Sequence, residues 1–598
     1  MKNNKNNFKN NNHINLLIKL WFKFKSKRRV QFVFFGFFMF FSSFAEILSL
    51  GAIVPFLAFL TAPEKLLNNN NINHLLILFN IKTEQELLFF VTIFFSISIV
   101  FSGIIRMLVL KIQTKLSTSI AGELCLEIYE RTLFQNYLTH VSRNTSEVIT
   151  ALNKAHGIAG HTILPVLLIF SSIFSILTII VALVFIDPLV SIFSFISFSL
   201  IYFLISWYNN KRLKSLGFVL NNNSTRVIKS IQESLGGIRD IIIDSNQRKY
   251  CNEFSKSNFP LLNAHSDIQF ISGSPRYLIE MIGIILISFL SYFLALKEGG
   301  IVGALPVLGA LVMGTQRLLP LFQQCFSSWA TLKGSQPSLE KIIFYLDQEV
   351  NSDDYNLDYI NKLPFNIFLE GKNISFRYSN DDSFVFERIN FKILKGSRIG
   401  IIGQTGSGKS TFLDLLMGLI IPTEGFLSID GIKLDSHELI RWRKNIAHVP
   451  QSIFLSDASI EENIAFSSTS SDVDESRVKW AAKCAKISNT IESLNFQYKS
   501  NVGERGVKLS GGQRQRIGIA RALYKNADVI VFDEATSALD SFTEQEVMDE
   551  INSLDKNLTL IIVAHRITTL KDCSVIFELK EGKLLNHNSY EEFIKKHI

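Results

Sequence analysis

The chain has 598 residues, a net charge of +8 and a charged fraction of only 19%. Its mean hydropathy is +0.23. This composition is unusual for a soluble globular protein and favours a membrane protein of two to four domains. The five cysteines have no paired or metal-like spacing. A disulfide scaffold is therefore excluded, and the soluble part of the protein is expected in the cytoplasm.

Residues 1–29 form a basic arm that contains lysines and arginines and no acidic residue. Such an arm can bind nucleic acid, but this one leads directly into an apolar run. We therefore expect a cytoplasmic N-terminus and no nucleic-acid partner. Within the arm, Asn15, Lys19 and Lys23 repeat at the helical period, which predicts a helix over 14–25 that lies on the membrane surface.

Six apolar segments are each long enough to span a bilayer, and they define a membrane domain over 30–325. They run over 30–61, 87–110, 162–186, 188–208, 277–296 and 301–325. The first, third and fifth links are short and are expected to face outward, and the first, over 64–86, fits either an amphipathic surface helix or a loop. The two long polar links, with turns near 137–147 and 236–246, are expected in the cytoplasm.

Residues 326–363 are predicted to be a linker, and 364–598 a soluble domain. In this domain, strand-like runs such as Ile399–Ile402 and Val529–Phe532 alternate with helical stretches. That alternation is typical of an α/β domain with a largely parallel sheet. The predicted fold class is therefore an α-helical six-span membrane domain followed by an α/β P-loop NTPase domain.

A phosphate-binding motif follows the first of these strand-like runs. It reads Gly403-Gln404-Thr405-Gly406-Ser407-Gly408-Lys409-Ser410 and leads into a helical run that starts at Thr411. Glycines let backbone N–H groups surround phosphate oxygens, the lysine adds a positive charge, and the serine hydroxyl reaches Mg²⁺. The alternative is a glycine-rich turn that matches the motif by chance, and the flanking strand and helix argue against it. The motif predicts a site for ATP with Mg²⁺.

The second strand-like run ends in Asp533-Glu534. A strand-end acid beside a P-loop holds Mg²⁺ through water. The adjacent Glu534 is the predicted general base for the attacking water. An Asp-Glu pair at a strand end is also a common solvated turn, but its position after the P-loop favours hydrolysis.

A third motif indicates which family of P-loop proteins the soluble domain resembles. Leu509-Ser510-Gly511-Gly512-Gln513 precedes a helix and stands between the P-loop and Asp533. In that order it resembles the signature of ABC transporters. Further motifs resemble those of the same family: Gln451 the Q-loop, Ser537 to Asp540 the D-loop, His565 the switch histidine, Tyr378 the adenine-stacking aromatic, and Gly503 to Gly506 the exporter-specific loop.

The resemblance covers the whole soluble domain and implies roles for these residues. Glu534, His565 and Gln451 would be catalytic, and Ser410, Gln451 and Asp533 would hold Mg²⁺. Tyr378, residues 403–411 and the signature 509–513 would bind ATP. Each ATP would lie between the P-loop of one subunit and the signature of the other. The expected assembly is a homodimer, with a heterodimer as the alternative, and the order of domains is similar to that of exporters.

Arginines inside the membrane domain are the candidate substrate residues, because ionisable groups in apolar spans are costly. Arg106, Arg276 and Arg317 lie about 24–30 Å from the outer ends of their spans at ~1.5 Å per residue. All three would sit near the inner-leaflet headgroups. If they face the cavity, they would form a basic ring for a phosphate-bearing lipid headgroup, because the forked guanidinium of an arginine binds two phosphate oxygens at once. The alternatives are structural pairing, with Glu280 for Arg276 and Glu46 for another arginine, or snorkelling towards the headgroups.

The segments 274–280 and 316–320, and Glu46 with Pro55, resemble bacterial lipid-linked oligosaccharide flippases. This resemblance implies inner-to-outer leaflet flipping of a phosphate-linked glycolipid in the bacterial inner membrane, with a cytoplasmic nucleotide domain. A multidrug or lipid A exporter is the nearest alternative. An ATP-gated channel or a membrane-anchored regulatory ATPase is the alternative from another class.

Overall fold

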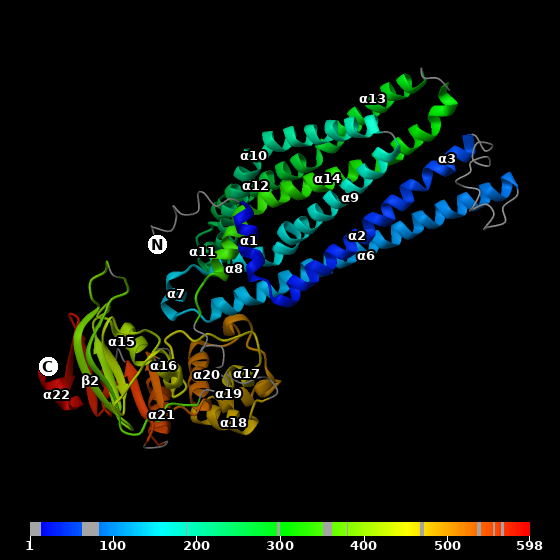
Figure 1. Cartoon of the computed structure of the whole chain (residues 1–598). Coiled ribbons are helices and arrows are strands. Elements are labelled where there is room, and N and C mark those ends of the chain that lie inside the picture. The colour runs from blue at the N-terminus through cyan, green and yellow to red at the C-terminus, as the bar shows by residue number, and fades with distance from the viewer. Residues whose placement is uncertain are drawn as a thin grey trace. The chain divides into compact units, whose positions relative to one another are not determined.

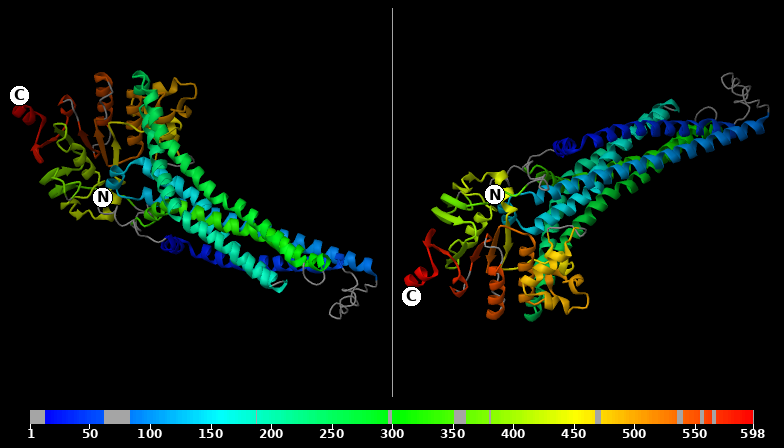
Figure 2. Two further views of the ribbon diagram at one scale, coloured as in Figure 1. Left: turned by 90° about the horizontal axis from the view of Figure 1, so that it is seen from above. Right: turned by 90° about the horizontal axis from the view of Figure 1, so that it is seen from below.

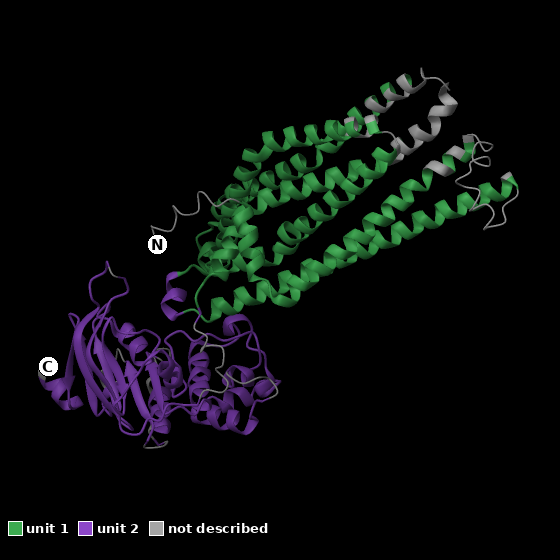
Figure 3. Ribbon diagram, in the orientation of Figure 1, with its two compact units in different colours: residues 1–135, 143–349 green, residues 136–142, 350–598 purple. Residues whose placement is uncertain are grey.

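The computed structural model describes residues 13–61, 83–186, 188–295, 300–350, 361–379, 381–466, 472–534, 540–553, 557–563 and 567–597. The chain divides into two compact units (Figure 3). Unit 1 comprises residues 1–135 and 143–349, and unit 2 comprises residues 136–142 and 350–598. The segment 64–86, expected to be either an amphipathic surface helix or a loop, lies almost entirely outside the described residues.

Unit 1 consists of helices, and its long helices run side by side (Figures 1 and 2). They are α1 (His13–Lys23), α2 (Ser26–Gly51), α3 (Ile53–Thr61), α6 (Glu84–Leu133), α8 (Thr145–Ile158), a π-helical turn η3 (Ala159–Ile163), α9 (Leu164–Ile186), α10 (Pro188–Gly236), α11 (Ile238–Ile243), α12 (Gln247–Gly273), α13 (Pro275–Ala295) and α14 (Gly300–Leu346). Exposed phenylalanines and isoleucines cover α2 and α6, as expected for helices that face lipid.

Among the described residues, three helices are long and apolar enough to cross a membrane: Ser26–Gly51, Gln85–Leu133 and Thr145–Phe185. They contain most of the first expected span, all of the second, and all but the last residue of the third. The other three expected spans overlap α10, α13 and α14.

Two helix boundaries differ from the expected spans. The first span breaks at Ala52 into α2 and α3. Pro55 has no N–H to donate to the carbonyl of Gly51, which accounts for a break one turn before it. At the other end of the unit, α14 continues to Leu346. It therefore runs far past residue 326, where the linker was expected to begin.

Helix α1 lies in the range expected for the surface helix and packs against α14. His13, Leu16 and Leu20 are buried, and His13 Nε2 is 2.9 Å from the carbonyl oxygen of Leu332. Ile14, Ile18 and Phe22 remain exposed on another side. The helix thus presents one apolar side to the unit and leaves a second available for lipid.

The described residues of unit 2 form two sheets. Its strands are β1 (Phe368–Phe376), β2 (Phe386–Leu394), β3 (Arg398–Gly403), β4 (Glu424–Ile429), β5 (Ile432–Lys433), β6 (Ile446–Val449), β7 (Val529–Asp533), β8 (Thr559–Val563), β9 (Val575–Lys580) and β10 (Lys583–His587). The first sheet is antiparallel with order β2-β1-β4-β5, and the second has order β10-β9-β3-β8-β7-β6. All neighbours in the second sheet are parallel except β9 and β10, as the sequence predicted.

The helices of unit 2 are α7 (Tyr137–Ser142), α15 (Lys409–Leu416), α16 (Ser436–Arg443), α17 (Ile460–Ile464), α18 (Glu475–Cys484), α19 (Ser488–Glu492), α20 (Gly511–Tyr524), α21 (Ser541–Ser553) and α22 (Tyr590–His597), with short 3₁₀ turns at 497–499, 504–506 and 567–570. The short helices α7 and α11 fall in the two cytoplasmic turns expected at 137–147 and 236–246. Leu138 of α7 packs against the core of unit 2.

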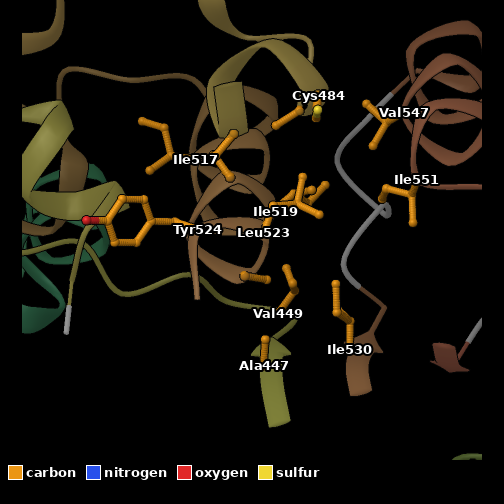
Figure 4. Close-up of a cluster of buried hydrophobic side chains, with 14 of the residues drawn as sticks. Ala447, Val449, Cys484, Ile517, Ile519, Leu523, Tyr524, Ile530, Val547 and Ile551 are labelled. Atoms are coloured by element: carbon orange, nitrogen blue, oxygen red, sulfur yellow. The ribbon is translucent and has the colours of Figure 1, made fainter. Parts of the chain in front are cut away.

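Two apolar cores hold unit 2 together. One joins both sheets through β3, β1, β2 and α15 and includes Phe376, Phe386 and Phe412. The other lies between the parallel sheet and the α17–α20 group, where Ile517 and Ile519 of α20 are completely buried (Figure 4). Both cores fix the ends of the parallel strands, which carry the site described next.

Candidate nucleotide site

The carboxyl ends of four parallel strands bring distant motifs to one edge of the sheet. β3 leads into the P-loop, β8 precedes the segment with His565, β7 ends at Asp533, and β6 precedes Gln451. Because neighbouring parallel strands end at the same edge, their following residues meet there. His565 itself lies outside the described residues, as do Ser537 to Leu539 of the D-loop.

Three glycines of the P-loop adopt backbone conformations with positive φ angles. Gly403, Gly406 and Gly408 all have positive φ angles, of 156°, 84° and 96°. A Cβ on Gly403 would lie 2.5 Å from the carbonyl oxygen of Leu579, so no other residue fits without a shift. Lys409 Nζ donates to the carbonyls of Gly403 at 2.7 Å and Gln404 at 3.1 Å.

The loop fits a phosphate group. Ser407 Oγ is buried and has no hydrogen-bond partner among the described residues. The lysine ammonium is held at the same loop, and α15 begins there, so its first N–H groups and positive dipole end point at the site. Ser410 stands in the first turn of α15, where its hydroxyl is exposed for a metal ion.

Tyr378 lies next to the start of α15. Its hydroxyl is 2.8 Å from Oγ1 of Thr411, while 52% of the residue is exposed. The hydrogen bond fixes the ring at the P-loop helix and leaves its face accessible. This arrangement suits the stacking role that the resemblance implied.

Asp533 and Glu534 occupy different environments at the end of β7. Asp533 pairs with Val563 of β8, and burial followed by the Glu534 charge raises the pKa of its carboxyl, whereas Lys409 opposes the shift. Glu534 has a φ of 51°, and its N–H donates to the carbonyl of Val563 at 3.2 Å. Left-handed backbone is costly for a residue with a side chain, and such strain concentrates at functional sites.

Gln451 contacts the predicted general base directly. Its Nε2 donates to Oε2 of Glu534 at 2.6 Å. The structure therefore unites three of the predicted catalytic and metal residues, namely Gln451, Asp533 and Glu534, at one edge of the sheet.

The signature caps a helix elsewhere in unit 2. Ser510 Oγ accepts from the Gln513 N–H at 3.2 Å, and Gln513 Oε1 accepts from the Ser510 N–H at 2.9 Å. This capping box starts α20 with Gly511 and Gly512 in its first turn. α20 packs on α17, α18 and β6, whereas α15 follows β3 (Figure 1). Within one chain, the P-loop at the start of α15 and the signature at the start of α20 therefore belong to different groups of helices and strands.

The exporter-like loop at Gly503 to Gly506 forms a short 3₁₀ turn in which Arg505 has a φ of 54°. A Cβ on Gly506 would meet Leu455 at 2.7 Å. Asp540, the described end of the D-loop, accepts from the N–H and hydroxyl of Thr543 at 2.9 and 2.7 Å and so caps α21.

Asp414, which was not among the predicted site residues, lies on α15 one turn after Ser410. Burial, and then the charge of Asp533, raises the pKa of its carboxyl to about 6. An acid one turn beyond the P-loop serine was the only available signal. Its electrostatic relation to Asp533 depends on the fold, which brings residues of α15 and β7 into one apolar core.

In unit 1, two of the three candidate arginines share one pocket. Arg106 Nε is 3.1 Å from Oε1 of Glu46, and Arg317 donates to the hydroxyl of Ser49. Glu46, Arg106 and Arg317 line a pocket of about 350 Å³ together with Gln113, Ser171, Ser175, Gln316 and Gln324. Arg276 is not among its lining residues and pairs with Glu280 at 2.7 Å. The structural ion pairs, which are the alternative to a substrate-binding role, are therefore present for Arg106 and Arg276.

Comparison with known proteins defines the class of the fold and of the nucleotide domain. Residues 386–537 match the sequence model of the ABC transporter family. The chain superimposes with a TM-score of 0.75 on a solved structure titled as a bacterial Atm1-family ABC exporter with ATP bound, over 95% of this chain and 96% of the other at 22% identity. The fold is thus that of an ABC exporter: a helical membrane domain followed by an ATP-binding α/β domain.

Particular relatives match over parts of the chain. The heterocyst differentiation ATP-binding protein HepA of Nostoc is 29% identical over 65% of this chain and 63% of its own length. The β-(1→2)glucan export protein NdvA of Bartonella bacilliformis is 39% identical over 37% of each chain. The α-hemolysin translocation protein HlyB of Escherichia coli O157:H7 is 41% identical over 38% of this chain and 32% of its own. The chain thus spans less than two thirds of each of these relatives.

Proposed function

We propose that two copies of this chain form an ATP-driven exporter that moves a phosphate-linked glycolipid from the inner to the outer leaflet of a bacterial inner membrane. The observation that carries the substrate class is the convergence of Arg106 and Arg317 on one pocket with Glu46. Two guanidinium groups beside one carboxylate leave a net positive charge in an apolar helix bundle. A phosphate-bearing headgroup offsets that charge, and a neutral hydrophobic drug does not.

The relatives support a polar substrate without deciding between classes. NdvA is named for export of a glucan and HlyB for export of a toxin. The pocket lining is rich in amide and hydroxyl groups, and Gln113 Nε2 donates to Ser171 Oγ at 2.9 Å. Such groups bind sugar hydroxyls, which favours a glycan near the phosphate.

Hydrolysis would proceed in the head-to-tail dimer that the placement of the two ATP motifs favours. Lys409 and the P-loop N–H groups bind the phosphates, and Ser410, Asp533 and Gln451 would hold Mg²⁺. When bound, Mg²⁺ neutralises charge on the phosphate oxygens. Glu534, oriented by Gln451, accepts a proton from the attacking water, and His565 is proposed to contact the γ-phosphate. Closure of the dimer would turn the membrane domain outward.

The test is ATP hydrolysis by the full chain in lipid nanodiscs, with and without a polyprenyl-pyrophosphate-linked oligosaccharide. The variants are Arg106→Ala and Arg317→Ala, with Arg212→Ala as a control because Arg212 forms an exposed pair with Asp267. Stimulation by the lipid, lost in both pocket variants and kept in the control, supports the proposal. The Arg276→Ala variant then tests how many arginines the site needs. If the site is the pocket of Arg106 and Arg317 alone, this variant keeps stimulation by the lipid; if the site needs all three arginines, the variant loses it.

Stimulation by hydrophobic drugs or lipid A, with none by the oligosaccharide lipid, would reject the glycolipid and select the alternative exporter class. Hydrolysis with no movement of any of these compounds between leaflets would point to a channel or regulatory ATPase.

A further inference from the structure

A second cavity, of about 670 Å³, lies in unit 1 among α8, η3, α10, α12 and α14. Its size falls in the range of small-molecule sites, roughly 300–1,000 Å³. Three basic residues line it, Lys154, His161 and His265, and no acidic residue does so in the part of the chain that the structure describes. The remaining polar lining consists of hydroxyl and amide side chains such as Ser224 and Gln269. The lining is therefore suited to an anion that also carries hydroxyl groups.

The π-helical turn η3 forms one wall of this cavity. Such turns are rare and frequent at functional sites. Two serines from other helices bind its carbonyl groups: Ser117 Oγ donates to Ala159 O at 2.7 Å, and Ser335 Oγ donates to His161 O at 2.9 Å. The ring of His161 lies over Gly157, where a Cβ would come within 3.2 Å of it. The turn is thus held in place with His161 at the cavity wall.

Lys154, on α8, is half-buried and forms no ion pair within the described ranges. Its ammonium donates to the side-chain and main-chain oxygens of Asn221. An ammonium group has three N–H donors, so one remains without an acceptor among the described residues. A partly desolvated cation with no carboxylate partner is costly unless an anion joins it.

The cavity of Lys154 and the pocket of Arg106 and Arg317 are both lined by residues of the same helix. Gln324 of α14 lines the pocket of Arg106 and Arg317, and Thr331 of α14 lines the cavity of Lys154. Seven residues of helix correspond to about 10 Å. A ligand in the second cavity therefore lies within two helical turns of the pocket in which the arginines meet.

We infer that the cavity of Lys154, His161 and His265 binds a ligand of the sugar-phosphate class, with Lys154 and His161 contacting the phosphate. The inference rests on the proposed function only for the source of this ligand. The headgroup of the transported lipid would occupy the cavity before it reaches Arg106 and Arg317. A free sugar phosphate would use the same contacts as a soluble ligand.

Two probes distinguish these sources in the full chain reconstituted in nanodiscs. The first is glucose 1-phosphate, whose binding is measured by calorimetry with glucose as the uncharged comparison. The second is the polyprenyl-pyrophosphate-linked oligosaccharide, for which the half-maximal concentration for ATPase stimulation is measured. The variants Lys154→Met and His161→Gln each remove a phosphate contact and keep approximate side-chain length.

Matched controls come from the same region. Lys229→Met removes an exposed lysine of α10 that pairs with Glu233, and His156→Gln removes a histidine of α8 that faces Cys125. Basal ATP hydrolysis is expected to be unchanged in all four variants, which verifies folding. For at least one probe, the dissociation constant or the half-maximal concentration for stimulation should rise about tenfold in both cavity variants. In the two control variants the same quantity should change less than twofold.

The outcomes with the two probes distinguish the proposed cavity ligand from the proposed lipid substrate. A loss confined to glucose 1-phosphate, with no stimulation by the lipid in any protein, supports the cavity and rejects the proposed lipid substrate. Equal stimulation by the lipid in all variants, with no binding of glucose 1-phosphate, overturns the cavity site and leaves the proposed function standing. No response to either probe overturns both.

Discussion

Gln451 Nε2 donates a 2.6 Å hydrogen bond to Oε2 of Glu534. The two residues follow neighbouring parallel strands, β6 and β7, but lie far apart in the sequence. Glu534 is held from both sides, because its backbone N–H also donates to Val563 of β8. This pair connects the proposed metal ligands to the proposed base and gives a direct test of catalysis.

Glu534→Gln is expected to lower the ATP hydrolysis rate at least about 100-fold, since loss of a general base typically costs 10²–10⁴-fold. ATP binding should persist, because the P-loop is untouched. Hydrolysis and nucleotide binding by the purified chain are the measurements, with the exposed Glu424→Gln as a control for charge. A variant that hydrolyses ATP at the wild-type rate would remove Glu534 from the catalytic assignment.

The left-handed backbone of Glu534 predicts that the side chain needed for hydrolysis lowers the stability of the folded protein. Both Glu534→Gly and Glu534→Ala remove the side chain, but only glycine adopts a φ of 51° without steric cost. We expect the glycine variant to be more stable than the alanine variant by about 1 kcal/mol, or roughly 2–4 °C in melting temperature. Calorimetry of the two variants checks this, and equal melting temperatures would show that the position carries no strain.

Two glycines of the P-loop should respond differently to alanine. A Cβ at Gly403 meets the Leu579 carbonyl at 2.5 Å, whereas a Cβ at Gly406 meets nothing within 4 Å. Both have positive φ, so Gly406→Ala controls for backbone strain. We expect Gly403→Ala to be destabilised by about 1–3 kcal/mol more than Gly406→Ala, as is typical of overpacking. Melting temperatures measured without nucleotide test this, and the reverse order would contradict the geometry of the loop.

The raised pKa of Asp414 predicts that the stability of the folded protein depends on pH. Burial, followed by Asp533, raises its pKa from 3.8 to about 6. Between these values the folded chain binds more protons than the unfolded chain, so the stability contributed by protonated Asp414 is lost as pH rises from about 4 to 6. Asp414→Asn should therefore stabilise the protein at pH 7.5 by about 1 kcal/mol, a value reduced for solvent screening of a partly exposed group.

The measurement for Asp414 is the difference in melting temperature between the variant and the wild type at pH 7.5 and at pH 5, without nucleotide. The advantage of the variant should shrink at pH 5. An advantage that stays constant across this range would mean that the carboxylate does not titrate there.

The local features of this protein follow from residues that are close together in the chain. Glycine spacing set the positive φ angles of the P-loop, Ser510 and Gln513 set the capping box of α20, and long apolar runs set the membrane helices. These features depend on neighbours within a few residues, so motif spacing and periodicity are sufficient to predict them.

Contacts between residues that are distant in the sequence arise only from the folding of the whole chain. The order of β3, β8, β7 and β6 brings Gln451 to Glu534 and Asp414 near Asp533, and helix packing brings Arg106 and Arg317 to Glu46 while Arg276 pairs with Glu280. The cavity of Lys154 and His161 likewise depends on a π-helical turn and on contacts between several helices. Such contacts depend on strand order and helix rotation, which arise from the packing of the whole chain and are not encoded in any short segment.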